Sequence, residues 1–438
     1  MNDLDALELS DKLWTGALEA SGSPLAHGSA PADDESINPF FPRNSLTEVG
    51  AGTAFVSAFA NSSVFATGEG LVQVDTGAPF AARGIHGMIR GWNAVEPLHT
   101  AVYSHGHIDH VFGVAVFEAE ATEQGWPAPR VVAHEAMPAR FDRYVLTAGY
   151  NGIINSRQFG ADVPWPTDYR HPDETYRDRL DLDVGDERFE LHHARGETDD
   201  HTWTWVPGRK ALCTGDLIIW CVPNAGNPQK VQRYAREWSL ALREMAGLGA
   251  EVLLPGHGLP VAGVDRVRAI LTDTAAMLDH LHDETVRMMN EGASLNTILH
   301  EVRAPRALLE KPYLRPIYDD PEFVVRNVWR LYGGWYDFDP ANLKPARAGE
   351  LGAEVAALAG GADRLAERAL ALAAEGRLRL AAHLVEFAAA AAPDDAAVHG
   401  ARAEIYEARV AEETALMAKG VFGAAARESR EKIAKDGG

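Results

Sequence analysis

The sequence predicts an α/β fold followed by an α-helical region, and three observations support this prediction. Over 46–270, short apolar runs typical of strands alternate with stretches of helical spacing, which is the pattern of α/β domains. Beyond residue 346 the composition shifts to alanine, leucine and arginine at helical spacing. The 438 residues suffice for two or three domains. We therefore expect an N-terminal arm over 1–45, an α/β domain over 46–270 and an α-helical part over 271–438.

Composition and charge limit the classes of partner. Hydrophobic residues make up 46% and charged residues 24% of the chain, as in globular proteins. The formal net charge of −22 argues against nucleic acid or an anionic membrane, but a small anionic substrate can still bind at a cationic metal site. The sequence has no run near the roughly 18 apolar residues that a membrane span needs.

Cysteine content and the N-terminal sequence point to a cytoplasmic location. The two cysteines, Cys213 and Cys221, are too few for a disulfide framework and match no zinc-finger spacing. The first five residues are acidic and lack the basic and apolar regions of a signal peptide. We expect a reducing environment for both reasons.

The early elements are predicted from hydrophobic spacing and turn residues. Residues 7–18 have amphipathic spacing, and a loop-like stretch rich in serine, proline and aspartate follows. The segment 46–77 predicts paired strands, 80–93 a helix and 98–104 a buried strand. Asp75 lies at a strand end before a glycine, where it either orients the histidine-rich loop after residue 104 or serves only as a turn residue.

The later elements continue the alternation and then become helical. Residues 130–135 predict a strand that includes His134, which we interpret as structural rather than as a metal ligand. Residues 138–180 are rich in aromatic residues, glycine and proline, the composition of a loop that covers a site. Further helices are expected over 261–290, 295–302, 322–335, 366–374, 379–392 and 396–411.

Four ligand-type residues within six positions form the strongest functional signal of the sequence. They directly follow the strand over 98–104. Histidines at positions i and i+2 of an extended strand end project to the same side, so one metal ion can contact both His105 and His107. Asp109 and His110 offer a carboxylate and a third imidazole to a second ion nearby. Packing alone does not explain such a cluster.

Three later segments each place a ligand-type residue beside a glycine, where the backbone can approach a metal closely. Glu197 lies in a turn that begins at Gly196 and ends at His201. Asp216 follows an apolar strand and a glycine, and His257 stands between two glycines after another apolar strand. A dinuclear site built on the first cluster needs these groups, namely a third ligand, a bridging carboxylate and a final histidine.

The order of these motifs resembles that of the metallo-β-lactamase superfamily of dinuclear metal hydrolases. The motifs are HxHxDH, a Gly-x-Thr-x-x-His turn, Thr-Gly-Asp and Pro-Gly-His-Gly. Glu197, at the second place of the turn, is characteristic of the alkyl sulfatase branch. The segment 325–343 resembles the helical dimerisation domain of alkyl sulfatases. The resemblance implies a metallo-β-lactamase αββα sandwich, an all-α dimerisation domain with helical-repeat character from 346, and a homodimer.

The resemblance also implies a ligand assignment for two divalent metal ions. His201 is the alternative to Glu197 as a ligand. Nitrogen and oxygen ligands without thiolate favour Zn²⁺, with Mn²⁺ or iron as alternatives. Asp109 and Asp216 are the candidate catalytic residues, because either carboxylate can accept a proton from water. One ion takes His105, His107 and Glu197, the other takes Asp109, His110 and His257, and Asp216 bridges them.

The predicted function is hydrolysis by a metal-bound hydroxide, and the resemblance implies hydrophobic alkyl or aryl sulfate esters as substrates. The alkyl sulfatase branch has a histidine- and asparagine-rich run after the bridging acid, whereas Asp216 precedes the apolar run 217–222. The next cations are Lys230, Arg233 and Arg236. Alternative substrates are therefore an activated aryl ether or a carboxylic or lactone ester. A non-catalytic metal-binding scaffold is a further alternative, and the expected partners are a small hydrophobic substrate and a second copy of the chain.

Overall fold

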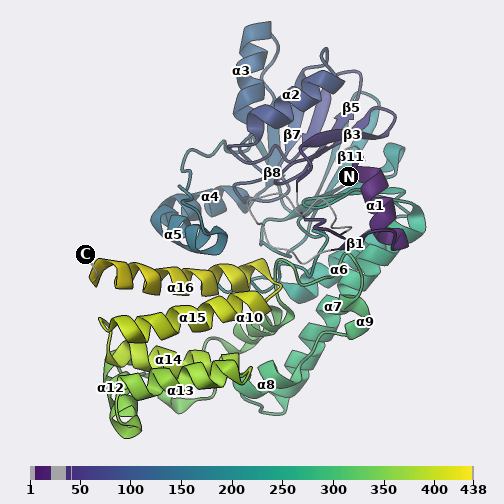
Figure 1. Cartoon of the computed structure of the whole chain (residues 1–438). Coiled ribbons are helices and arrows are strands. Elements are labelled where there is room, and N and C mark those ends of the chain that lie inside the picture. Colours follow the sequence, from purple (N-terminus) through teal and green to yellow (C-terminus); the bar gives the residue numbers. More distant parts are fainter. Residues whose placement is uncertain (1–4, 21–35, 41, 437–438) are drawn as a thin grey trace. The chain divides into compact units, whose positions relative to one another are not determined.

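The computed structural model describes residues 5–20, 36–40 and 42–436 (Figure 1). The loop-like stretch expected after residue 18 falls largely within 21–35, outside the described residues. The chain divides into two compact units, which we call the sheet unit and the helical unit. The sheet unit comprises 1–148, 165–293 and 297–334, and the helical unit comprises 149–164, 294–296 and 335–438.

The first sheet, within the described residues, has seven strands in the order β3-β4-β5-β6-β7-β8-β9. Strands β3 to β6 pair antiparallel, and β6 to β9 pair parallel. The carboxyl ends of β6 and β7 therefore meet at one edge, where α/β sheets place their sites. The strands are β3 (Ser45–Gly50), β4 (Thr53–Ser57), β5 (Ser62–Ala66), β6 (Leu71–Val74), β7 (Leu98–Val102), β8 (Arg130–His134) and β9 (Glu174–Tyr176).

The second sheet has six strands in chain order among the described residues. Only β13 and β14 pair parallel, and the other neighbours pair antiparallel. A short 3₁₀ helix, η1 (Pro207–Arg209), connects β12 to β13. The strands are β10 (Arg179–Val184), β11 (Glu187–His193), β12 (Thr202–Val206), β13 (Ala211–Gly215), β14 (Val252–Pro255) and β15 (Val261–Ala262).

The two sheets pack face to face with helices outside them. The rings of Phe65 on β5 and Phe189 on β11, both fully buried, meet edge to face with centroids 5.4 Å apart. Helix α2 packs on β3 and β4, α3 packs on β7, and α7 packs on β14 and β15, beside α6. This arrangement confirms the predicted αββα sandwich. The helices are α2 (Ala82–Trp92), α3 (Val114–Gln124), α6 (Ala235–Ala246) and α7 (Val264–Asn290).

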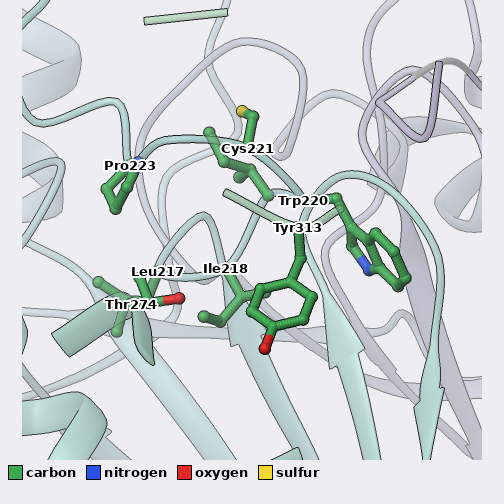
Figure 2. A pocket seen from close by; sticks show the side chains of 8 residues that line it. Leu217, Ile218, Trp220, Cys221, Pro223, Thr274 and Tyr313 are labelled. Atoms are coloured by element: carbon green, nitrogen blue, oxygen red, sulfur yellow. The ribbon is translucent and has the colours of Figure 1, made fainter. Parts of the chain in front are cut away.

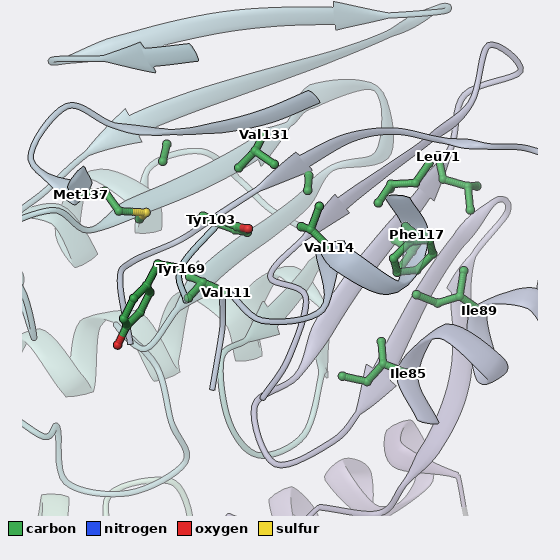
Figure 3. Close-up of a cluster of buried hydrophobic side chains, with 14 of the residues drawn as sticks. Leu71, Ile85, Ile89, Tyr103, Val111, Val114, Phe117, Val131, Met137 and Tyr169 are labelled. Carbon is green, nitrogen blue, oxygen red and sulfur yellow. The ribbon is translucent and has the colours of Figure 1, made fainter. Parts of the chain in front are cut away.

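An apolar cluster holds α2 and α3 on the first sheet (Figure 3). Ile85 and Ile89 of α2 and Phe117 of α3 lie in the same cluster as Leu71 and Val131 of the strands, and each is at most 1% exposed. Full burial of such a side chain contributes roughly 1.5–3 kcal/mol. Ile85 and Ile89 are four positions apart, so both point from one face of α2 toward the sheet.

The segment 138–180, which the sequence predicted to be a covering loop, contains two helices, so this prediction was wrong. Helix α4 (Met137–Leu146) begins with Pro138 in its first turn, where the missing N–H costs no hydrogen bond. Helix α5 (Ala148–Phe159) follows, and the longest stretch with neither helix nor strand is 160–173. The composition of the segment was misleading, because α4 has buried residues at helical spacing. Packing of this face stabilises a helix in spite of the loop-like composition. That face consists of Met137, Arg140, Phe141 and Tyr144.

The N-terminal arm begins with helix α1 (Ala6–Thr15), which packs on β3 and β15. Asp5 caps it by accepting the backbone N–H of Glu8, and the Glu8 carboxylate accepts the N–H of Asp5 in return. The buried face of α1 packs this part of the arm on the body of the sheet unit. Beyond it, β1 (Glu19–Ala20) pairs parallel with β2 (Ser36–Ile37).

Several helices beyond residue 270 belong to the sheet unit by their contacts. Helices α7 and α10 (Pro321–Gly333) pack on each other within this unit, as does the short helix α9 (Arg306–Leu309). Helix α8 (Leu295–Glu301) lies at the transition between the units. The exact domain boundaries of the sequence analysis stay a prediction.

The helical unit is packed through small side chains. Ala369, Ala381 and Ala388 are completely buried, and alanine at such positions lets helices approach closely. Consecutive helices pack on one another, α13 on α14 and α15 on α16. In the part of the chain that the structure describes, every helix falls short of the length and apolarity that crossing a membrane requires. The helices are α11 (Pro340–Leu343), α12 (Ala348–Ala359), α13 (Ala362–Ala374), α14 (Leu378–Ala391), α15 (Ala396–Glu412) and α16 (Leu416–Asp436).

Candidate metal centre

The loop after β7 and two loops of the second sheet bring a first group of ligand-type side chains together. His105 is fully buried, and its Nε2 lies 2.8 Å from Nδ1 of His107. Glu197 Oε1 lies 3.7 Å from Nδ1 of His107, and Asp216 Oδ2 lies 3.8 Å from Nε2 of His105. One nitrogen or oxygen atom from each of these four residues lies within 4.8 Å of the other three. That compactness is what a single metal ion requires of its ligands.

A second group lies beside the first and consists of Asp109, His110 and His257. Nε2 of His257 and Nε2 of His110 lie 3.3 and 3.7 Å from Oδ2 of Asp109. Asp216 also reaches this group, with Oδ1 3.3 Å from Nε2 of His110 and Oδ2 3.4 Å from Nε2 of His257. The seven clustered residues include three acids, and among these Asp216 is the one that lies close to imidazoles of both groups.

Parallel pairing of β13 and β14 explains how Asp216 and His257 meet. Both strands end at the same edge; Asp216 directly follows β13, and His257 follows β14 after a single glycine. Gly256 is required there, because a Cβ at this position would lie 2.1 Å from Oδ1 of Asp216. Gly215, which precedes Asp216, has a φ of 49°, a left-handed conformation that favours glycine. The glycines of the two motifs therefore make room for the ligands.

Asp75 holds the histidine loop from behind. Its Oδ2 lies 2.8 Å from Nδ1 of His110 and accepts the hydroxyl of Ser104 at 2.7 Å, while its Oδ1 accepts the backbone N–H of Ser104. Asp75 adopts a φ of 59°, which is uncommon for a residue other than glycine. Of the two roles that the sequence left open, the structure supports the orienting one, because the carboxylate fixes which nitrogen of His110 faces Asp216.

His201 and His134 lie outside both groups. Nε2 of His201 lies 3.0 Å from the backbone oxygen of Thr214, and its ring stacks on that of His105. His134 stacks on His193 with ring centroids 3.7 Å apart. The structure therefore places Glu197, and not His201, among the clustered side chains, and it places His134 in a structural role.

Sequence reasoning missed the residues that hold Glu197. The buried Arg233 donates from Nη1 to Oε1 of Glu197 at 2.6 Å and to its backbone oxygen at 2.9 Å, and Asn224 donates from Nδ2 to the same carboxylate. The sequence marked Arg233 only as a nearby cation, together with Lys230 and Arg236. Arg236 instead pairs with Asp279. No local pattern distinguishes the three, because burial selects Arg233.

Two residues from the region around α10 fix the loop that carries Asn224 and Arg233. Asp319 is fully buried and accepts the backbone N–H groups of Gly226 and Asn227 at 2.7 and 3.2 Å. The side-chain amide of Asn327 donates to the backbone oxygens of Ala225 and Arg233, both at 2.9 Å. The partners lie more than ninety positions apart in sequence, so these contacts are visible only in the fold.

The apolar run after Asp216 is part of the interior and not of a binding surface. Leu217, Ile219 and Trp220 are at most 3% exposed, and the side chains of this run surround a gap that admits no water (Figure 2). Tyr313 and Thr274 close the same gap from two other segments. The apolar run 217–222, which departs from the alkyl sulfatase pattern, therefore packs in the interior.

Burial and mutual charge set the pKa values of the clustered groups. Burial lowers the pKa of His105 and His107 well below the usual range, and neighbouring cations add to this effect. Burial raises the pKa of Glu197 to about 8, although Arg233 opposes it. Burial would lower the pKa of His257, but the carboxylates of Asp216 and Asp109 together outweigh burial and raise this pKa to about 10.

The donor set fits divalent metal ions. Glu197 Oε2, His110 Nε2 and Asp216 Oδ1 are buried and have no hydrogen-bond partner, and leaving such atoms unpaired costs about 1–3 kcal/mol each. Cations held by the two groups would satisfy all three atoms. Both cysteines are buried and outside the two groups, so the ligand-type atoms are nitrogen and oxygen only. This set suits zinc, manganese or iron.

Comparison with known proteins identifies the two parts of the chain. Residues 58–257, which include most of the sandwich and its clustered histidines and acids, match the family model of the metallo-beta-lactamase superfamily. Residues 294–432 match the model of the alkyl sulfatase dimerisation domain. The two matches follow each other along the chain in the order that the sequence motifs predicted.

Individual relatives are alkylsulfatases. A linear primary-alkylsulfatase of Pseudomonas sp. (strain ATCC 19151) is 27% identical over 322 residues, which cover 68% of this chain and 60% of the relative. An (R)-specific secondary-alkylsulfatase of Pseudomonas sp. is 29% identical over 353 residues, 74% of this chain and 53% of the relative. The chain thus spans about half to three fifths of the curated relatives that it matches.

A solved structure has the same fold. The stereoselective inverting sec-alkylsulfatase Pisa1 from Pseudomonas sp. superimposes with a TM-score of 0.80 at 24% identity. The match covers 89% of this chain and 66% of that structure. At this identity the likeness establishes the fold, including the succession of sandwich and helices.

Proposed function

We propose that the chain is a dinuclear metal-dependent hydrolase of sulfate esters with a hydrophobic organic part. The observation that carries this proposal is the position of Asp216, whose two carboxylate oxygens lie 3.3 to 3.8 Å from nitrogens of both ligand groups. A carboxylate so placed can join two metal ions into one centre. The alkylsulfatase relatives and the matched dimerisation domain favour a sulfate ester over other esters.

The proposed ligands divide as the two groups do. Two divalent ions bound there would lower the pKa of a shared water toward 7 and neutralise charge on the leaving oxygen. His201 is not a ligand in this assignment, because its ring nitrogen faces a backbone oxygen. We assign His105, His107 and Glu197 to one ion, Asp109, His110 and His257 to the other, and Asp216 to both.

The chain's own residues orient the candidate ligands, and one of them would accept a proton. Asp75 holds His110 in one orientation, and Arg233 holds Glu197 and leaves a buried positive charge beside the first group. Asp109, 17% exposed, is the more accessible of the two candidate carboxylates, so it would take the proton from the attacking water. Asp216, 6% exposed, would keep its charge between the two groups.

The remaining features of the proposal concern the metal, the assembly and the location. Zinc is the first choice among the metals that the nitrogen and oxygen donors suit. The matched dimerisation domain supports a homodimer. The two free, buried cysteines are compatible with the cytoplasm, which keeps thiols reduced.

The test is metal analysis combined with a substrate panel on the purified full chain. The panel contains dodecyl sulfate, an aryl methyl ether with electron-withdrawing groups, and a lactone. We expect inorganic sulfate to be released, release to stop after chelation, and Zn²⁺ to restore it. Hydrolysis of only the ether or the lactone would favour those alternatives. Two bound metals without turnover of any compound would favour the non-catalytic scaffold.

A further inference from the structure

A pocket of about 240 Å³ lies beside the metal centre, and none of the seven candidate ligands lines it. This volume is roughly that of eight water molecules in the liquid. One wall is cationic and consists of Arg140 and Arg143 on α4. The apolar part of the lining comes from Ala136, Ala139 and Val231.

The wall of the pocket that Arg140 forms lies against the loop that carries His107. Gly106, which separates the first two histidines, lies so close to Arg140 that a Cβ there would be 2.7 Å from Cδ of the arginine. Tyr144, one turn further along α4, has its ring centroid 6.4 Å from that of His107. A substrate with its ester at the metal centre can therefore extend its organic part along α4.

Arg140 has a donor that the protein leaves unused. The residue is 6% exposed, its Nε lies 2.9 Å from Oδ1 of Asp200, and its Nη2 pairs with Asp199. Nη1 of Arg140 is buried without a hydrogen-bond partner. Because an unpaired charged donor in the interior is costly, an acceptor from a ligand would stabilise it.

Arg143 adds a positive charge that is not neutralised. Among the described residues no carboxylate forms an ion pair with it, and its one close aromatic contact is with the ring of Tyr144, 4.8 Å from the guanidinium carbon. Asp199 is the acidic residue of the pocket lining, and it is already paired with Arg140. Arg143 is therefore the cation of the pocket lining that no carboxylate neutralises, in a chain whose net charge is −22.

We propose that this pocket binds a carboxylate carried by the organic part of the substrate, while the ester lies at the metal centre. This inference rests on the proposed function and narrows its substrate class to sulfate esters with a second, remote anionic group. A planar carboxylate matches the forked donors of guanidinium groups such as those of Arg143 and Arg140. Methylene groups of the same substrate would pack on Ala139 and Val231.

The experiment compares matched sulfate esters on the metal-loaded full chain. Linear alkyl sulfates of six, eight and ten carbons are paired with the same compounds ending in a carboxylate. We expect kcat/KM to favour the carboxylated compound at one or more chain lengths by roughly tenfold, the order of magnitude of a charge-assisted hydrogen bond. Arg143→Gln should bring this ratio close to one, mainly through KM.

Two further variants keep the test independent of folding. Val231→Glu, at a residue that is 45% exposed, should also lower the ratio, because it adds a negative charge to the pocket. Arg177→Gln, at an exposed arginine that pairs with Glu135, should leave the ratio as in the wild type. A wild-type ratio of one at all chain lengths would overturn the inference, as would a preference that survives both Arg143→Gln and Val231→Glu.

Binding of sulfonates separates this inference from the proposed function. Alkyl sulfonates with and without a terminal carboxylate cannot be hydrolysed as esters, so calorimetry measures their affinity whether or not the chain is a sulfatase. Tighter binding of the carboxylated sulfonate, lost in Arg143→Gln, supports the pocket assignment even if no sulfate ester turns over. Equal affinity for both sulfonates contradicts it even if sulfate esters are hydrolysed.

Discussion

The sheet unit and the helical unit bury different kinds of side chain. Around the carboxyl ends of β7, β13 and β14, the sheet unit buries imidazoles, carboxylates and Arg233. The helices α12 to α15 bury mostly alanine and leucine, with Leu372 and Ala381 as examples. Burying an unpaired charge is expensive and burying alanine is not. The comparison teaches that the first unit holds costly charged and polar groups in its interior. The second unit, over α12 to α15, has the mostly apolar interior of a scaffold.

The largest expected effect tests the chemical half of this comparison. Asp216→Asn removes the carboxylate that contacts both ligand groups, and we expect sulfate release to fall by about a thousandfold or more, as for groups that act as a unit in a catalytic site. Metal analysis should show fewer than two ions per chain. Asp183→Asn, at an aspartate that is 61% exposed, is the matched control. Full activity of Asp216→Asn would remove this residue from the centre.

The scaffold half is tested by Leu372→Ala in α13. Leu372 is 2% exposed, and its truncation should lower the free energy of unfolding of the helical unit by about 2–5 kcal/mol. Leu358→Ala, at an 89% exposed position on α12, should cost far less. Metal content and kcat at a temperature where the variant is folded should match the wild type. Loss of metal from Leu372→Ala would show that the two units are not separable in this way.

A pH experiment tests the cost of burying charge at Asp319. Burial raises the pKa of this carboxyl to about 6, although three backbone N–H groups oppose the shift. Between pH 4 and 6 the folded chain then holds a proton that the unfolded chain has released, so this group makes stability fall as pH rises. The size is about 3 kcal/mol for a shift of about two units.

The measurement is urea unfolding of the wild type and Asp319→Asn, both with chelator. The neutral asparagine does not titrate. The free energy of unfolding of the variant should therefore rise relative to that of the wild type between pH 4 and 7. A difference in unfolding free energy that stays constant over this range would contradict the raised pKa.

The smallest effect concerns the loop of the sheet unit that carries Arg233. Asn327→Ala removes the donors to the backbone oxygens of Ala225 and Arg233, so Arg233 should hold Glu197 less firmly. Outer partners of metal ligands typically contribute a factor of about 10–100 in metal affinity, and we expect a loss in that range. Arg326→Ala changes the exposed neighbour on α10 and should leave affinity unchanged. Unaltered affinity in Asn327→Ala would limit this residue to a structural role.

The sequence could predict which candidate ligands cluster, because their spacing is local. His105 and His107 share a strand end, and Glu197, Asp216 and His257 each stand beside a glycine after a turn or strand. The α/β alternation of elements was predictable for the same reason, since strand and helix periods are properties of short segments, whereas the αββα sandwich was implied by the resemblance of the motifs to a known superfamily. The loop predicted over 138–180 was wrong, because composition cannot show the buried face that makes α4 a helix.

By itself, the sequence determined the fold class, the seven clustered side chains and the order of the two parts. Only the tertiary structure decided which neighbours support them: Arg233 rather than Arg236 as the partner of Glu197, and Asp319 as support for the loop that carries Arg233. The physical reason is distance along the chain. Charge and hydrogen bonding act through space, and residues a hundred positions apart meet only after the sheets have formed.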